Sequence, residues 1–203
     1  MTPLIGKALD FMRKAHGSYK RKHGTPYADH PEAVLNILTN EFGGSVSENI
    51  QVIALLHDTL EMGETDEAEI AREFGLEVLT GVKLLTRQKG ESFGDYAARL
   101  RTAPKEIRLV KAADRLHNLR EVLLANDPDW ALEYVRETRE HVLPLIDDPW
   151  FLTKLTEAVS KIAHCFSHAS FSSPLSTSQM ATRLQKEMPQ MNWRLEDSGS
   201  HLT

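Results

Sequence analysis

Two histidines and two aspartates in this sequence have the types and the order of a divalent-metal site. His57 and Asp58 are adjacent at the end of an apolar run, His30 lies upstream and Asp114 lies downstream. Imidazole nitrogens combined with carboxylate oxygens suit a first-row ion such as Mn, Fe, Co or Zn better than Ca or Mg, which prefer oxygen ligands alone. Four such ligands leave coordination positions for water or substrate, as a catalytic site requires. The pattern therefore predicts a site that activates water for hydrolysis.

Glu61 supplies the further carboxylate that hydrolysis at such a site needs. It follows Asp58 by three residues, close enough to orient or deprotonate the attacking water. A metal-bound water has a lowered pKa, so hydroxide forms near neutral pH and can attack phosphorus in line. We therefore expect Glu61 and Asp58 to be the catalytic residues. The expected metal ligands are His30, His57, Asp58 and Asp114.

The pair His57 and Asp58 must lie where a helix ends. Adjacent side chains point in different directions along a regular helix, so both reach one ion only where the helix stops. Thr59 follows directly and is typical of a chain that is leaving a helix. Asp114 lies in a long amphipathic pattern, and Asn118 follows it by four residues. Residues four apart share a helix face, so a metal ligand and a substrate contact can project into the same cleft.

Helical periodicity covers nearly the whole chain up to residue 166. Apolar residues recur every three or four positions in segments separated by proline, glycine or capping residues. These segments run from Leu4 to Gly17, from Pro31 to before Gly43, from a Ser45 cap to His57, from a Thr65 cap to Gly75, from there through Leu85, from Ser92 past Leu100, from Pro104 past Asn118, from about Asp129 to His141, and from Pro149 to Phe166. We see no alternating strand pattern, internal repeat or glycine-rich phosphate loop, so the predicted fold class is all-α.

The composition fits one globular domain and argues against several classes of partner. The chain has 203 residues, of which 41% are hydrophobic and 26% charged. A net charge of −5 argues against nucleic acid, whose phosphates need a basic face. A single cysteine and the lack of a signal peptide or membrane-length apolar segment predict a cytoplasmic protein without a membrane partner. We expect residues 1–168 to form the domain and residues 169–203 to be a partly disordered tail.

Three stretches around these residues resemble the consecutive motifs of a known enzyme family. They cover residues 27–31 (YADHP), 54–61 (ALLHDTLE) and 110–120 (VKAADRLHNLR). In this order and at this spacing they resemble HD-domain phosphohydrolases, most of all the hydrolase domain of RelA/SpoT-type proteins and the stand-alone small alarmone hydrolases. The resemblance extends over about residues 3 to 125. It implies an HD-domain helical bundle with the metal site in a central cleft.

The resemblance also implies a substrate and a metal. Members of that family remove pyrophosphate from the 3′ position of (p)ppGpp, which leaves GDP or GTP, usually with manganese. Arg21 and Lys22 match the basic pair with which the family contacts the guanine nucleotide, and Asn118 matches a further nucleotide contact. We therefore expect a guanine-nucleotide substrate, Mn²⁺ as the ion, and Arg21, Lys22 and Asn118 at the substrate. The sequence leaves the oligomeric state open.

One position departs from the family pattern. Active relatives have Glu-Asp where this chain has Glu61-Met62, so the second acid is missing, although Glu64 follows two residues later. Loss of an acid beside a metal site can lower activity roughly 10- to 100-fold without destroying the site. Two alternatives therefore stand beside the alarmone hydrolase. One is a phosphatase acting on another nucleotide, for example on the 2′-phosphate of NADPH, and the other is a nucleotide-binding HD module with weakened catalysis.

Taken singly, each of these residues also has a purely structural interpretation. His30 could cap the helix that begins at Pro31, and His57 could be a core histidine at a helix end. Arg21 and Lys22 could be a solvated charge cluster in a loop. We favour the metal site because several independent structural explanations would otherwise have to coincide in the order of the family's motifs.

Overall fold

The computed structural model describes residues 2–61, 65–125 and 127–166. Met62, Glu64 and the expected tail at residues 169–203 lie outside the described residues, so what the sequence predicts for them stays a prediction. Within the described ranges the secondary structure is helical, apart from one isolated bridge that pairs Lys20 with Pro26. The predicted all-α class is confirmed.

The helices follow one another through short connections. In chain order they are α1 (Pro3–His16), α2 (Asp29–Asn36), α3 (Glu48–Leu56), α4 (Glu67–Phe74), α5 (Leu76–Leu85), α6 (Phe93–Arg101), α7 (Lys105–Val122), α8 (Pro128–Glu137) and α9 (Pro149–Phe166). Shorter helical segments continue three of them: π-helical Ile37–Glu41 after α2, 3-10 Leu123–Ala125 after α7, and π-helical Thr138–Val142 with 3-10 Leu143–Leu145 after α8. In the described part of the chain, none of the helices has the length and apolar character that crossing a membrane requires.

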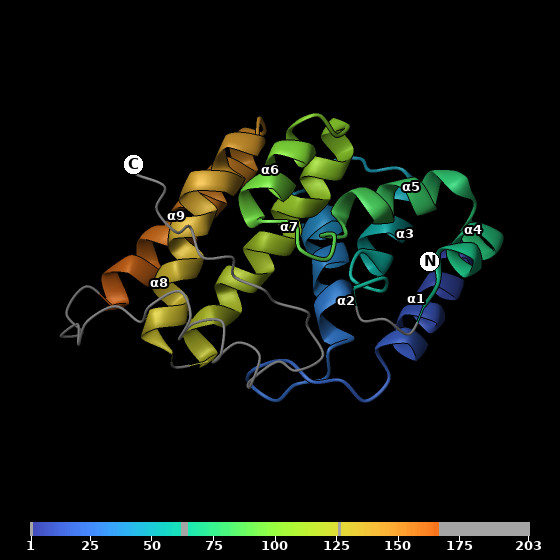
Figure 1. The fold of residues 1–203 in the computed structure, drawn as a ribbon, viewed down its shortest axis with the longest axis horizontal. Coiled ribbons are helices and arrows are strands. Elements are labelled where there is room, and N and C mark those ends of the chain that lie inside the picture. Colours follow the sequence, from blue (N-terminus) through green and yellow to red (C-terminus); the bar gives the residue numbers. More distant parts are fainter. Residues whose placement is uncertain (1, 62–64, 126, 167–203) are drawn as a thin grey trace, which may run out of the picture.

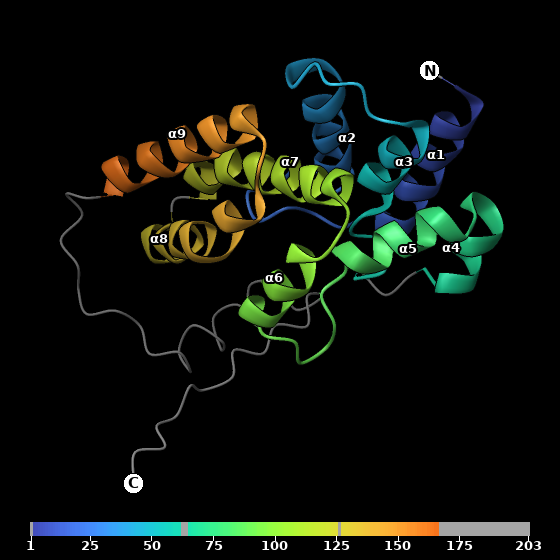
Figure 2. The ribbon, with the colours of Figure 1, turned by 90° about the horizontal axis from the view of Figure 1, so that it is seen from above.

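Helix α7 is central to the bundle (Figure 1). It contacts α2, α3 and α5 on one side and α8 and α9 on the other. Figure 2 shows α8 and α9 beside one end of α7, while α1, α3, α4 and α5 gather at the opposite side of the molecule. Apolar side chains from both groups are fully buried, among them Leu55 of α3, Val110 of α7 and Phe151 of α9. A polar residue in the middle of α7 therefore lies in the protein interior.

Two helices begin at residues other than the predicted caps. The N-cap of α3 is Ser47 and not Ser45, because the Ser47 hydroxyl accepts a hydrogen bond from the Ile50 backbone N–H at 3.3 Å. Gln51 helps to fix this start, since its side-chain amide donates to the carbonyl oxygen of Val46 at 3.2 Å. In α3, the serine nearer to the first helical turn therefore makes the capping bond that the free backbone N–H groups at a helix start require.

The cap of helix α4 also lies after the predicted residue, here by one position and not by two as in α3. Its N-cap is Asp66 and not Thr65, and an oxygen of the Asp66 carboxylate accepts from the Glu69 backbone N–H at 2.6 Å. A carboxylate at this position also interacts favourably with the positive end of the helix dipole.

Other predicted boundaries agree with the structure more closely. Ser92 caps α6, Pro104 precedes α7, and Gly75 separates α4 from α5 with a φ of 88° that favours glycine. Helix α2 is an exception because it begins at Asp29, so Pro31 occupies its first turn and does not open it. The proline is tolerated there because the first backbone N–H groups of a helix have no partner within the helix.

Candidate metal centre

Three separate elements bring two histidines and two aspartates together beside α7. His30 lies in the first turn of α2, His57 ends α3 and is followed by Asp58, and Asp114 lies in the middle of α7. The Nε2 atom of His30 lies 3.2 Å from Asp114 Oδ1 and 3.6 Å from Asp58 Oδ2. The Nε2 atom of His57 lies 3.2 Å from Asp58 Oδ1 and 3.8 Å from Asp114 Oδ1. The structure thus gathers all four of the candidate ligands.

The end of α3 explains how two adjacent residues face one point. The Nδ1 atom of His57 lies 2.8 Å from the carbonyl oxygen of Ala54, which can only accept, so Nδ1 carries the hydrogen. Thr59 turns the chain, because its hydroxyl and its backbone N–H both donate to the carbonyl oxygen of Leu56, at 2.7 and 3.0 Å. The hydrogen bond to Ala54 directs Nε2 of His57 into the cluster, and the turn carries Asp58 to the same place.

The donor set fits a divalent metal ion. The Nε2 atoms of His30 and His57 are both buried and neither has a hydrogen-bond partner. One nitrogen or oxygen atom from each of His30, His57 and Asp114 lies within 4.8 Å of the others. A buried polar atom without a partner is costly, and an ion would satisfy both nitrogens and neutralise the carboxylates. These residues could therefore hold a cation with mixed nitrogen and oxygen ligands.

The local charges prepare the two histidines differently. Burial, together with the positive charge of Arg21, lowers the pKa of His30 to about 4, so this imidazole is neutral at pH 7. Burial also lowers the pKa of His57, but the carboxylates of Asp58 and Asp114 outweigh it and raise the pKa to about 9. Burial by itself would raise the pKa of Asp58, yet His57 and His30 hold it well below its usual range. In the ion-free cluster, a proton on His57 therefore compensates part of the negative charge.

Three further side chains hold the carboxylates in place. The ammonium group of Lys111 lies 2.7 Å from Asp114 Oδ2, and Asn118 donates to Asp114 Oδ1 at 2.5 Å. The hydroxyl of Tyr27 donates to Asp58 Oδ2 at 2.8 Å. Burial would raise the pKa of Asp114, but the Lys111 charge, foremost among its neighbours, keeps it well below its usual range. Both carboxylates are thus ionised and oriented, as metal ligands need to be.

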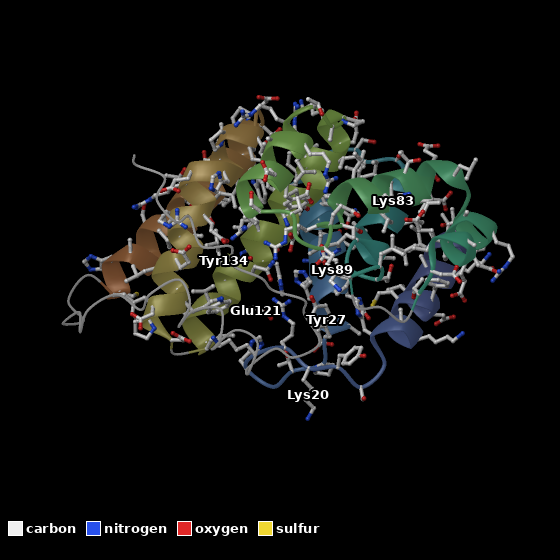
Figure 3. All side chains as sticks on the ribbon, viewed as in Figure 1. Lys20, Tyr27, Lys83, Lys89, Glu121 and Tyr134 are labelled. Atoms are coloured by element: carbon white, nitrogen blue, oxygen red, sulfur yellow. The ribbon has the colours of Figure 1, made fainter. Side chains whose placement is uncertain are left out.

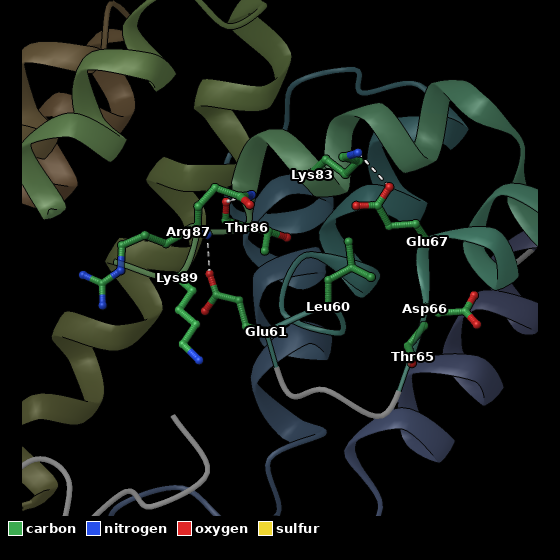
Figure 4. Close-up of a pocket in the computed structure, with 10 residues that line it drawn as sticks. Leu60, Glu61, Thr65, Asp66, Glu67, Lys83, Thr86, Arg87 and Lys89 are labelled. Atoms are coloured by element: carbon green, nitrogen blue, oxygen red, sulfur yellow. Dashed lines mark hydrogen bonds and ion pairs between the residues drawn. The ribbon is translucent and has the colours of Figure 1, made fainter. Parts of the chain in front are cut away.

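Glu61 lies in the turn after α3 and borders a cleft of about 480 Å³. Its Oε1 atom accepts a hydrogen bond from the Arg87 backbone N–H at 2.7 Å. Figure 4 shows this bond with the Lys89 side chain nearby. The same view shows the ion pair between Lys83 and Glu67, which also line the cleft. Burial, assisted by the Asp58 charge, raises the pKa of Glu61 to about 7. A carboxylate with such a pKa can accept and release a proton near neutral pH.

Arg21 connects the loop before α2 to the metal cluster. Its Nη2 atom donates to Asn118 Oδ1 at 2.5 Å, and Asn118 in turn contacts Asp114. The guanidinium also forms an ion pair with Glu121 and lies 5.2 Å from the centre of the Tyr27 ring. Figure 3 labels both of these partners, Glu121 on α7 and Tyr27 in the loop before α2. The structure therefore brings two of the three predicted substrate contacts, Arg21 and Asn118, to the edge of the cluster.

Lys22 takes a different direction from its neighbour. Its ammonium group lies 2.9 Å from Asp127 Oδ2 and 4.5 Å from the centre of the Trp130 ring. Both partners belong to the start of α8, so this side chain ties the loop to the far part of the bundle. The structure does not bring Lys22 to the cluster in the way that it brings Arg21.

Three residues that the sequence analysis does not predict for the site contact the candidate ligands: Tyr27, Lys111 and His117. Each stands inside or next to the motifs that contain the ligands, and Lys111 and His117 lie three residues before and after Asp114. That spacing places them on the helix face that carries Asp114 and could have indicated their role. His117 Nδ1 lies 2.8 Å from His30 Nδ1, a contact between residues far apart in the sequence.

Comparison with known proteins agrees with this geometry. The sequence pattern of the HD domain family matches residues 8–141, a stretch that includes all four clustered ligands. The chain belongs to the HD domain family. The helical bundle predicted from the resemblance is therefore confirmed as an HD domain, and its His/Asp cluster is suited to a divalent metal.

Two kinds of relatives share sequence with this HD domain. Human guanosine-3′,5′-bis(diphosphate) 3′-pyrophosphohydrolase MESH1 is 35% identical over 137 residues, which cover 64% of this chain and 76% of the human protein. The Xenopus tropicalis protein of the same name is 34% identical over 140 residues, covering 66% and 78%. A probable GTP pyrophosphokinase of Mycobacterium leprae is 36% identical over 152 residues, or 70% of this chain. The chain spans only 19% of the length of that larger protein.

Two solved structures have the same HD-domain fold. One is a metazoan ortholog of SpoT that hydrolyses ppGpp; it has a TM-score of 0.63 and 22% identity, covering 79% of this chain and 96% of that one. The other comes from Listeria monocytogenes and has a TM-score of 0.53 and 28% identity, covering 66% and 97%. At 22% identity, the first of these structures shows a likeness of fold alone, which extends over nearly the whole length of that structure.

Proposed function

We propose that this HD domain is a metal-dependent (p)ppGpp 3′-pyrophosphohydrolase that produces GDP or GTP and pyrophosphate. The observation that carries the proposal is the convergence of the buried Nε2 atoms of His30 and His57, to which no hydrogen bond is made, on two ionised carboxylates. The substrate class is supported by the named activity of the MESH1 relatives, of whose length this chain matches more than three quarters.

In this proposal His30, His57, Asp58 and Asp114 hold the ion, and Mn²⁺ is the ion we expect. When bound, it would supply a Lewis acid for a phosphate oxygen and lower the pKa of a coordinated water. Lys111, Asn118 and Tyr27 keep the two carboxylates oriented through the contacts described above. Loss of a supporting contact of this kind typically lowers metal affinity or activity about 10- to 100-fold.

Glu61 and Asp58 are the catalytic residues of the proposal. Glu61 takes the proton from the attacking water, since its pKa of about 7 allows it to be ionised at neutral pH and to release the proton afterwards. The water oxygen forms a bond to the phosphorus next to the 3′ oxygen while the bond between that phosphorus and the 3′ oxygen breaks. The departing 3′ oxygen receives the proton that Glu61 took from the water and becomes the 3′ hydroxyl, and pyrophosphate is released. The hydrogen bond from the Arg87 backbone N–H holds Glu61 toward the cleft.

Arg21, Lys22 and Asn118 contact the nucleotide in the proposal. Arg21 is paired with Glu121 and Asn118 in the structure, so the nucleotide must replace at least one of these bonds when it binds. The planar guanidinium can stack on a base and approach phosphate at the same time. Lys22 would have to leave Asp127 and Trp130 to reach the substrate.

The remaining expectations belong to the same proposal. Residues 1–168 would carry the activity and residues 169–203 would be an appended tail. We propose that the protein acts in the cytoplasm on a small nucleotide and binds neither nucleic acid nor membrane. The net charge of −5 and the single cysteine support these assignments.

The test is to incubate Mn²⁺-loaded protein with ppGpp and separately with NADPH, and to separate the products by anion-exchange chromatography. GDP with pyrophosphate, formed by the native protein and not by the Asp58→Asn variant, is the expected result. Survival of ppGpp beside an active control hydrolase would refute the proposal.

Met62 gives one specific reason to retain a second candidate. It stands where the family pattern has an acid, so the site could serve a phosphatase acting on another nucleotide. Release of inorganic phosphate from NADPH without cleavage of ppGpp would decide for that phosphatase. Tight nucleotide binding without turnover of either substrate would instead favour a binding module.

A further inference from the structure

His117 makes a direct contact with one of the candidate metal ligands. Its Nδ1 atom lies 2.8 Å from Nδ1 of His30, and the two ring centres are 4.9 Å apart. His30 is only 1% exposed, and its other nitrogen, Nε2, has no hydrogen-bond partner and faces Asp114 and Asp58. The contact with His117 therefore couples the position of the hydrogen on His30 to that on His117.

Two arrangements of the hydrogen are possible between the imidazoles. Two nitrogens at 2.8 Å need one hydrogen between them, so one ring donates and the other accepts with its lone pair. If His117 donated, neutral His30 would carry its own hydrogen on Nε2, where it would block an ion. If His30 donates, its Nε2 atom presents a lone pair to Asp114 and Asp58. Only the second arrangement allows His30 to be a ligand.

We propose that His117 is a positioning residue that accepts the Nδ1–H of His30 and thereby presents the Nε2 lone pair of His30 to the metal. The inference rests on the proposed metal-dependent function. His117 follows Asp114 by three residues on α7, so one helix face supplies a carboxylate ligand and also orients a histidine ligand from α2. Residues that orient a ligand in this way typically change metal affinity 10- to 100-fold.

A second ion is the competing explanation for this contact. Ligand atoms of His30, His117 and Glu121 also lie within 4.8 Å of one another. Against a second ion, the Glu121 carboxylate already accepts two hydrogen bonds from Arg21, so a cation there would lie beside a guanidinium charge. The distance of 2.8 Å between the two nitrogens is also that of a hydrogen bond. The proposal therefore predicts one ion per chain.

The experiment compares His117→Leu with His117→Asn in the full chain. Leucine removes the acceptor, whereas the amide oxygen of asparagine can take the place of the imidazole Nδ1. Binding of Mn²⁺ is measured by competition with a fluorescent chelator, and bound metal is counted after dialysis. We expect one ion per wild-type chain, about 10- to 100-fold weaker binding by His117→Leu, and binding within about threefold of wild type by His117→Asn. Melting curves of the ion-free variants show whether each is folded.

The outcomes separate this inference from the proposed function. Unchanged affinity in a folded His117→Leu variant, equal losses in both variants, or two ions per wild-type chain would each overturn the role of His117 while metal binding itself stands. Wild-type protein that binds no ion would overturn the proposed function and this role with it. Rescue by asparagine alone supports the role, because a change in packing would not depend on an acceptor at this position.

Discussion

Metal binding at the cluster should become tighter as the pH rises, because the ion must displace a proton from His57. The pKa of this imidazole is raised to about 9, so at pH 7 nearly every ion-free molecule carries the proton. His30, with a pKa of about 4, is already neutral, and both carboxylates are already ionised. His57 should therefore release one proton per ion bound between pH 6 and pH 8, and ionisation of Glu61 or of a metal-bound water in this range adds to that number.

The smallest expected change in metal affinity follows from the His57 proton. The apparent dissociation constant should fall at least about tenfold per pH unit, or at least about 100-fold between pH 6 and pH 8, which corresponds to about 3 kcal/mol. The same proton stabilises the ion-free fold, because the pKa of His57 is raised above its ordinary value of 6.5. That contribution is complete below about pH 6.5 and is lost as the pH rises through about 9. The rise in melting temperature caused by the ion should therefore be larger at pH 8 than at pH 6.

Competition between the protein and a chelating dye, calibrated at each pH, measures the dissociation constant of Mn²⁺, and melting curves with and without the ion give the stabilisation. The His164→Gln variant is a matched control, since this histidine is exposed on α9 and its replacement should leave the slope unchanged. A dissociation constant that stays within threefold from pH 6 to pH 8, or that becomes tighter on acidification, would refute the reasoning.

Four further predictions concern catalysis and packing. Glu61→Gln should lower kcat roughly 10²- to 10⁴-fold, because glutamine cannot take a proton from water. The Mn²⁺ affinity should change only a few-fold, because glutamine can still accept the hydrogen bond from the Arg87 backbone N–H. Steady-state kinetics measure the first effect and chelator competition measures the second. Met62→Asp should raise the rate of ppGpp hydrolysis if the missing acid limits it, and an unchanged or lower rate in the same assay would contradict that account. Gly81→Ala should cost about 1–3 kcal/mol, because a Cβ there would lie 2.4 Å from Ile53 Cδ1 across the contact of α5 with α3. Gly6→Ala, where nothing lies within 4 Å of the added atom, should instead gain about 0.5–1 kcal/mol, and urea unfolding of both variants would expose a reversed order.

The fold class and the candidate ligands could be predicted because both depend on local information. Helical spacing marks the bundle, and the residue types at His57 and Asp58, together with a helix end, leave few alternatives to a shared ion. The predicted caps of α3 and α4 are wrong because two residues that can cap a helix lie close together in each case. Ser45 and Ser47 have the same chemistry, and only the packing of the preceding chain decides which one precedes the first turn.

The contacts that the sequence could not provide join residues that are distant along the chain. Lys22 resembles Arg21 in charge and position, yet it turns toward Asp127, which lies 105 residues away. His117 pairs with His30 across 87 residues, and nothing in the local pattern names its partner. Such pairings depend on how α2, α7 and α8 approach one another, which periodicity does not determine.

Lys111 makes the metal-loaded cluster positively charged, whereas the whole chain is negatively charged. In the ion-free cluster its charge and the His57 proton balance Asp58 and Asp114. A divalent ion in place of that proton leaves one positive charge in excess, inside a protein with a net charge of −5. An approaching anion is then repelled by the whole protein at long range and attracted by the metal cluster at short range. Because dissolved salt screens distant surface charges more strongly than buried ones, moderate ionic strength should speed the encounter with an anionic nucleotide.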